Sequence, residues 1–266
     1  MMEVILLALS GVLVGGIVNV LADELPEGRI LRRPRNKDGS LRPVCTWLGL
    51  TAQVYEWRRS KPPCPKLNWR YPLTELAVAG LMVMTQLATG DDASPLSPQR
   101  IIWQAYAAIF VLLAVVDLER KRVLTVPVLV AAALALVDAA VLPQPGPHLA
   151  SALAGGLCGG LLFSFAYLGG LGFARLAEGI DTVVFGPGDV YLMALAGLIL
   201  GFPNVLAAIV LAILLGGGGA LLYLALLRIR GRRYQRFTAL PYAPYILAAA
   251  TIVLLFQSDI SRLFFG

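Results

Sequence analysis

The chain alternates between long apolar runs and short polar segments. A helix rises about 1.5 Å per residue, so about 20 apolar residues cross the roughly 30 Å hydrocarbon core of a bilayer. Eight runs come close to that length and predict eight transmembrane helices, over residues 4–21, 73–88, 101–116, 123–142, 149–171, 190–202, 205–227 and 242–256. We therefore expect an all-α polytopic membrane protein, with residues 1–266 forming one integral membrane domain.

Composition supports the membrane class. Hydrophobic residues make up 58% of the chain and charged residues 14%, and the mean hydropathy is +0.75. A soluble domain of this length needs far more charge to cover its surface. The composition therefore excludes an ordinary solvated fold.

Basic residues gather in four of the segments between the predicted spans. All of the 22 Lys and Arg residues except Arg100 and Arg262 lie in segments 24–72, 117–122, 172–189 and 228–241. With eight spans these segments share one side, and Lys and Arg accumulate on the cytoplasmic side. The pattern predicts that both termini lie outside the cytoplasm and that 24–72 is an irregular, basic, Pro- and Trp-rich cytoplasmic loop. It also predicts contact with anionic membrane lipids and no nucleic-acid partner, because topology alone accounts for the net charge of +6.

Few side chains are available for metal binding or nucleophilic catalysis. The chain has one histidine, His148, in a Pro-rich segment, and three cysteines, Cys45, Cys64 and Cys158, without a CxxC pair. A Ser/His/Asp triad and a four-cysteine zinc site are therefore not expected. Chemistry would have to come from carboxylates, hydroxyls or the backbone.

Two acidic residues stand out at the ends of predicted spans. Asp117 follows run 101–116, and Asp189 precedes run 190–202, which is short and begins after an apolar Gly/Pro segment. Irregular backbone at membrane depth is tolerated only against protein or a water-filled cavity, so we expect a cavity beside Asp189. Two carboxylates on one membrane face, one ionised and one protonated, suit the activation of a water molecule.

Two glycine clusters lie within predicted spans. Gly155, Gly156, Gly159 and Gly160 form two overlapping GxxxG registers, and 216–219 is a run of four glycines. Small residues at this spacing let helix backbones approach closely, so we expect these clusters to be helix-packing sites.

Four motifs follow one another along the chain. They are Gly15-Gly16-Ile17-Val18-Asn19-Val20 with Leu25-Pro26, Arg70-Tyr71-Pro72-Leu73-Thr74-Glu75-Leu76, Val116-Asp117-Leu118-Glu119, and Gly186-Pro187-Gly188-Asp189. In this order they resemble the motifs of the type IV prepilin peptidase family, bacterial membrane aspartic peptidases of the GxGD type.

The resemblance implies an aspartic endopeptidase of the bacterial inner membrane. It would cleave the basic leader of single-span prepilin- or pseudopilin-like proteins at the cytoplasmic face, for pilus assembly or protein secretion. Asp117 and Asp189 would be catalytic, and Gly186, Pro187 and Gly188 would form the active-site loop, with the two glycines permitting close backbone approach. No cofactor would be needed for proteolysis.

Three further acids lie near the predicted cytoplasmic interface, where a basic leader would arrive. They are Glu24, Glu27 and Glu119. We expect them to contact the leader.

The resemblance also bears on a second activity. Many family members N-methylate the new N-terminus with S-adenosylmethionine and carry paired CxxC motifs that are thought to bind zinc. This chain retains Asn19 and Glu75, which leaves methylation open, but its loop cysteines are unpaired, so zinc is not expected. Leu124 and Tyr191 replace a proline and a lysine common in the family, from which we expect altered substrate preference.

Two other classes fit the same pattern less well. A proton- or ion-coupled transporter also places carboxylates in short, Gly/Pro-interrupted spans, but the chain shows no internal repeat. A non-catalytic membrane scaffold is the third alternative.

Overall fold

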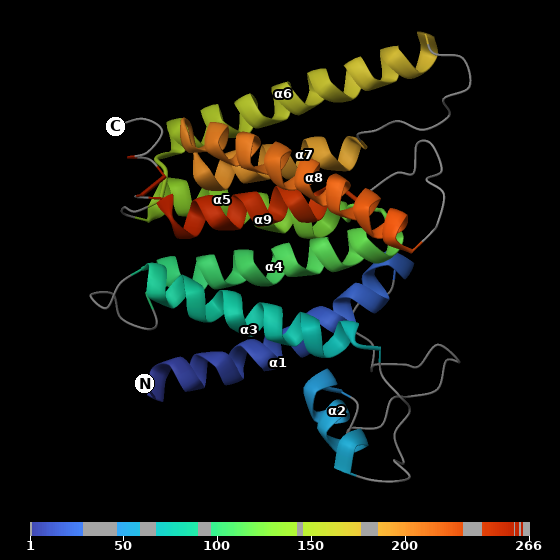
Figure 1. Ribbon diagram of the computed structural model, residues 1–266. Coiled ribbons are helices and arrows are strands. Elements are labelled where there is room, and N and C mark those ends of the chain that lie inside the picture. The colour runs from blue at the N-terminus through green and yellow to red at the C-terminus, as the bar shows by residue number, and fades with distance from the viewer. Residues whose placement is uncertain are drawn as a thin grey trace. The chain divides into compact units, whose positions relative to one another are not determined.

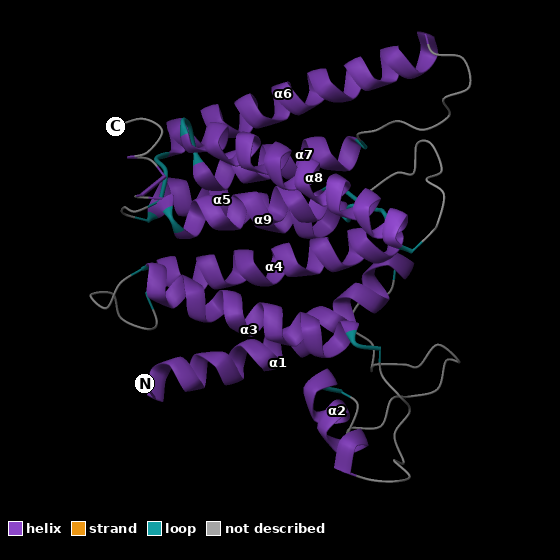
Figure 2. Ribbon diagram, in the orientation of Figure 1, coloured by secondary structure: helices purple, strands orange, loops and turns teal. Residues whose placement is uncertain are grey.

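A computed structural model describes residues 2–28, 47–58, 68–89, 97–142, 146–176, 186–230, 241–257, 259–260 and 262. Every regular element in these ranges is helical (Figure 2). The elements are α1 (Met2–Glu24), the short 3-10 helix η1 (Leu25–Glu27), α2 (Gly49–Arg58), α3 (Arg70–Ala88), α4 (Pro98–Arg120), α5 (Thr125–Val141), α6 (Leu149–Leu176), α7 (Pro187–Leu200), α8 (Asn204–Ile229) and α9 (Ala243–Leu255).

Each of the eight predicted apolar runs coincides with one of these helices. Four of the helices, α1, α4, α6 and α8, are long and apolar enough to cross a membrane, and α5, α7 and α9 are shorter apolar helices. Large apolar side chains also stay exposed, as on α8, where Leu214 and Leu221 are 65% and 70% exposed. Such surfaces suit lipid rather than water. The protein is therefore an all-helical polytopic membrane protein; the number of crossings stays a prediction.

Two boundaries differ from the predictions. Segment 24–72 is not wholly irregular, because α2 lies within it. The first N–H groups of α2 donate to the carboxylate of Glu75 on α3. Because this partner lies outside the segment, the local sequence did not predict the helix. Helix α4 continues to Arg120, which places Asp117 within its last turn rather than after its end.

The described helices fall into two compact units, Met1–Val116 and Asp117–Gly266. In the first unit α1 packs along α3 (Figure 1). A Cβ atom on Gly11 would lie 2.5 Å from the Ala79 Cα, and one on Gly15 would lie 2.6 Å from the Glu75 Cα. Glycine at these positions therefore lets the two helix backbones touch.

In the second unit α7 is the central helix. It packs against α5, α6, α8 and α9, and most of its side chains are buried. Its closest neighbour is α6, which lies along one side of it (Figure 1). A Cβ on Gly159 would lie 2.6 Å from the Met193 carbonyl oxygen, and one on Gly156 would lie 2.8 Å from Leu198. The predicted packing role of the first glycine cluster is confirmed.

The second cluster lies on α8 and packs against aromatic side chains at the start of α9 rather than against a helix backbone. A Cβ on Gly216 would overlap the ring of Tyr242, and one on Gly219 would overlap Tyr245. The two glycines between them, Gly217 and Gly218, have open space instead. The packing role is thus confirmed for the outer two members of the run.

Replacing Gly159 with alanine should destabilise the second unit, because the new methyl group meets backbone of α7. We expect a loss of about 1–3 kcal/mol in the free energy of unfolding, typical of overpacking. Gly169→Ala is the matched control, since Gly169 lies on the same helix with nothing within 4 Å. That change should be neutral or stabilise by about 0.5–1 kcal/mol. Thermal unfolding in detergent measures both, and equal effects would contradict the packing role.

Candidate active site

Asp117 is a buried acid in the last turn of α4, with 6% of its surface exposed. The helix ends before Lys121, whose φ of 52° is incompatible with a right-handed α-helix. The Lys121 N–H donates to the Asp117 carbonyl at 2.8 Å. The Asp117 carboxylate accepts a backbone hydrogen bond from Ala243 and interacts electrostatically with Lys121. Its Oδ2 is buried and has no hydrogen-bond partner within the described part of the chain.

Asp189 lies in the first turn of α7, and 8% of its surface is exposed. Its Oδ2 accepts the backbone N–H of Gly186 at 3.0 Å, while its own N–H donates to the Gly186 carbonyl at 3.1 Å. This reciprocal pair closes the start of the helix, and the positive end of the helix dipole favours a carboxylate there. Asp189 also interacts electrostatically with Asp117. The fold therefore brings together the two acids that the sequence singled out.

The two motif glycines before Asp189 differ in their surroundings. A Cβ on Gly188 would lie 2.6 Å from a methyl group of Val123, just before α5. Among the described residues, the atoms nearest to a Cβ on Gly186 would be 3.9 Å away or more, and its φ is −87°. A close neighbour is thus seen at Gly188 and not at Gly186 in the described chain, and the roles of both glycines in an active-site loop stay a prediction. Pro187, at the first position of α7, suits a helix start because it lacks an N–H.

Parts of the sequence reading fall outside the described residues. They are segment 182–185, which belongs to the apolar stretch before Asp189, and the loop cysteines Cys45 and Cys64. The cavity expected beside Asp189 stays a prediction. Within the described ranges no group of three or more His, Cys, Asp or Glu side chains could hold a metal ion.

The three acids expected to meet a leader peptide lie in different settings. Glu119 is exposed in the last turn of α4, two residues after Asp117. Glu27 is exposed in η1, whereas Glu24, at the end of α1, is 7% exposed and its Oε2 is buried without a hydrogen-bond partner in the described chain. Glu119 belongs to the unit that holds the two aspartates, and the other two belong to the first unit.

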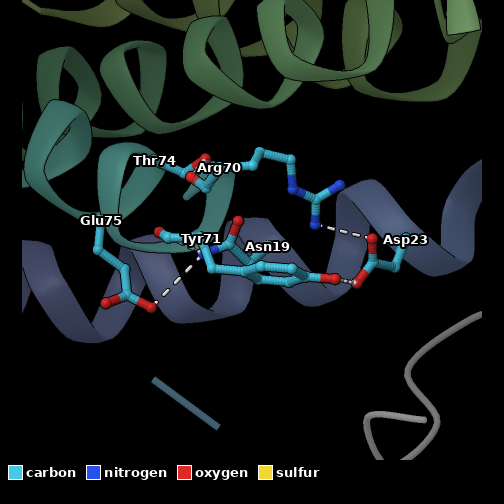
Figure 3. Close-up of polar contacts among 6 residues, drawn as sticks. All are labelled: Asn19, Asp23, Arg70, Tyr71, Thr74 and Glu75. Carbon is cyan, nitrogen blue, oxygen red and sulfur yellow. Dashed lines mark hydrogen bonds and ion pairs between the residues drawn. The ribbon is translucent and has the colours of Figure 1, made fainter. Parts of the chain in front are cut away.

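Glu75 and Asn19, the residues related to methylation by resemblance, lie in a polar cluster of the first unit (Figure 3). Glu75 is completely buried, and its carboxylate accepts the first N–H groups of α2, from Gly49 at 2.5 Å and from Leu50 at 2.9 Å. Asn19 donates to the Tyr71 carbonyl at 3.0 Å and to Glu75 at 3.5 Å. Glu75 thus caps α2 from a neighbouring helix, a structural use of the residue that the local sequence did not suggest.

Asp23 completes this cluster, and the sequence reading missed it. Its carboxylate accepts hydrogen bonds from Arg70 at 2.7 Å and from the Tyr71 hydroxyl at 2.9 Å (Figure 3). The Arg70 guanidinium also lies 4.2 Å from the centre of the Tyr71 ring. The available signal was spacing, because Asp23 lies one helical turn after Asn19 and so shares its face of α1.

Comparison with known proteins agrees with this geometry. Residues 104–222 match the type IV leader peptidase family, and this segment contains both aspartates and the GxGD motif. This part of the chain belongs to that family. The chain is accordingly an aspartic-type leader peptidase, as its motifs predicted, and peptidases of this family need no cofactor. No curated protein and no solved structure matches the chain.

The family match favours the peptidase over the transporter and the scaffold. It ends before α9 and begins within α4, so it leaves α1, α2, α3 and α9 unassigned.

Replacing Glu75 with alanine should release the first turn of α2. Hydrogen bonds to charged groups contribute about 1.5–3 kcal/mol each, so backbone N–H exchange in 49–58 should accelerate at least about tenfold. Hydrogen–deuterium exchange of the full chain in detergent measures this. Glu27→Ala, at an exposed acid of the same unit, is the control and should leave that exchange unchanged. Unchanged protection of 49–58 in Glu75→Ala would show that the carboxylate does not hold α2.

Proposed function

We propose that this leader peptidase cleaves the basic leader of prepilin- or pseudopilin-like single-span proteins, with Asp117 and Asp189 activating the attacking water. The observation that carries the proposal is the meeting of two buried carboxylates, from α4 and α7, within electrostatic reach of each other. Unpaired charged groups destabilise an apolar helix bundle. An ionisable residue in such a place is therefore a candidate for a functional role. The Asp117 Oδ2, which has no hydrogen-bond partner among the described residues, supports a catalytic use.

The chemistry needs one ionised and one protonated carboxyl group. The ionised group takes a proton from water, and the resulting hydroxyl attacks the scissile carbonyl carbon while the protonated group donates to the carbonyl oxygen. The C–N bond then breaks as the leaving amine takes up the proton that the first group had accepted, and one hydroxyl group of the intermediate returns a proton to the second carboxylate. The pair titrates as a unit, because each charge influences the other.

The distribution of charge supports a cytoplasmic location for this centre. Asp117 and Asp189 each adjoin segments that carry the basic residues, and translocation of such segments is disfavoured. We propose eight crossings in the bacterial inner membrane, with both termini outside the cytoplasm and with lipid against the exposed apolar faces. Substrate would enter as a helix from the membrane while its leader stays at the cytoplasmic interface.

Methylation is not required for this function. S-adenosylmethionine would be a cofactor only if the chain also modifies the new N-terminus. The capping of α2 by Glu75 and the hydrogen bonds of Asn19 support structural roles for both residues instead of roles in methylation.

Replacing either aspartate with asparagine should abolish leader removal. General acid and general base catalysis each contribute about 100- to 10,000-fold, and the substitution keeps the shape of the side chain. The assay is co-expression with the cognate tagged prepilin, followed by separation of precursor and mature forms on a gel. Asp138→Asn is the matched control, because Asp138 is a buried acid of the same unit in the last turn of α5. Processing that survives Asp117→Asn or Asp189→Asn would overturn the dyad.

Charge reversal of Glu27 and Glu119 should weaken recognition of a basic leader. Both side chains are exposed, so lysine can replace them without disturbing a buried contact, whereas Glu24 is unsuitable because it is buried. Exposed ion pairs contribute about 0.2–1 kcal/mol each, so KM should rise about two- to tenfold. A substrate whose leader carries Gln in place of Lys and Arg should show no change. An equal effect on both substrates would exclude leader recognition by these acids.

A further inference from the structure

The start of α9 lies against Asp117 in the second unit. Ala243, the first residue of the helix, is completely buried, and its N–H donates to the Asp117 carboxylate. Tyr242, the residue before it, lies within electrostatic reach of Asp189. Helix α9 also packs against α7, whose first turn carries Asp189.

The direction of the Tyr242 side chain is fixed by packing. Its ring lies against α8 at Gly216, where no side chain larger than glycine fits. The ring centre is 6.3 Å from that of Phe163 on α6 and 6.1 Å from that of Tyr245 on α9. Contacts from three helices therefore hold the phenol ring in place. The hydroxyl of a tyrosine packed in this way usually finds a hydrogen-bond partner.

The Tyr242 hydroxyl can donate a hydrogen bond. Among the described residues, one backbone N–H, that of Gly186, donates to the Asp189 Oδ2. A second donor on the same carboxylate, directly or through one water, would hold its orientation and stabilise its charge.

We propose that the first turn of α9 completes the catalytic centre, with the Ala243 N–H holding Asp117 and with the Tyr242 hydroxyl acting as a positioning residue for Asp189. The inference rests on the proposed aspartic dyad. It concerns residues outside the segment that matches the family, so the match does not assign them.

The test is Tyr242→Phe, which keeps the ring and removes only the hydroxyl. Tyr245→Phe is the matched control, a neighbouring tyrosine whose hydroxyl lies at Gly219. With the cognate prepilin and purified full-length protein, we expect Tyr242→Phe to lower kcat about tenfold or more and leave KM unchanged. Because an ionised carboxylate loses a donor, the acidic limb of the pH–rate profile should move to higher pH. Tyr245→Phe should resemble wild type in all three measurements.

A second measurement does not depend on activity. The carboxyl infrared band that disappears in Asp189→Asn should titrate at a different pH in Tyr242→Phe than in wild type, and Tyr245→Phe should not move it. An unmoved band, or unchanged kcat and pH profile, overturns the role of Tyr242 while Asp189→Asn remains inactive and the dyad stands. Loss of the dyad itself would show instead as cleavage that survives Asp189→Asn.

Discussion

Direct backbone contact between α6 and α7 is the packing on which the second unit depends. At Gly155, Gly156 and Gly159 of α6 a Cβ would come closer than 3.0 Å to atoms of α7, so α7 lies against α6 at a distance that larger residues at these positions would not allow. The remaining sides of α7 are covered by α5, α8 and α9. A helix enclosed in this way has a fixed position, and its first turn carries Asp189. The glycines are thus remote from the carboxylates but determine where one of them lies.

Buried acids are treated in two different ways in this molecule. The Glu75 carboxylate accepts hydrogen bonds from Gly49, Leu50 and Asn19, which compensates its removal from water and uses its charge to start a helix. Asp117 has one oxygen without any partner in the described chain, and it interacts with a second acid, Asp189. A saturated carboxylate supports the fold, whereas an incompletely satisfied pair retains capacity for a substrate or a water.

Hydrogen bonds between helix starts and carboxylates recur in both units. The first turns of α2, α7 and α9 each present N–H groups to a carboxylate, from Glu75, Asp189 and Asp117 respectively. Such N–H groups have no partner within their own helix, and in an apolar environment water is not available to them. Pairing them with acids satisfies donor and acceptor together. The short helices α2, α7 and α9 therefore position the acidic side chains.

The sequence alone determined the apolar helices, the asymmetry of basic charge and the choice of Asp117 and Asp189. These signals are local, because a run of apolar residues or an acid at its end stands out without knowledge of any partner. It also predicted the GxxxG packing, since spacing on one helix is sufficient for that. Only the tertiary structure decided that Glu75 caps α2, that Gly188 lies against Val123, and that the N–H of Ala243 donates to Asp117. Those relations depend on which helices become neighbours, and hydrophobic periodicity gives the face that a helix buries but not the residue that lies opposite.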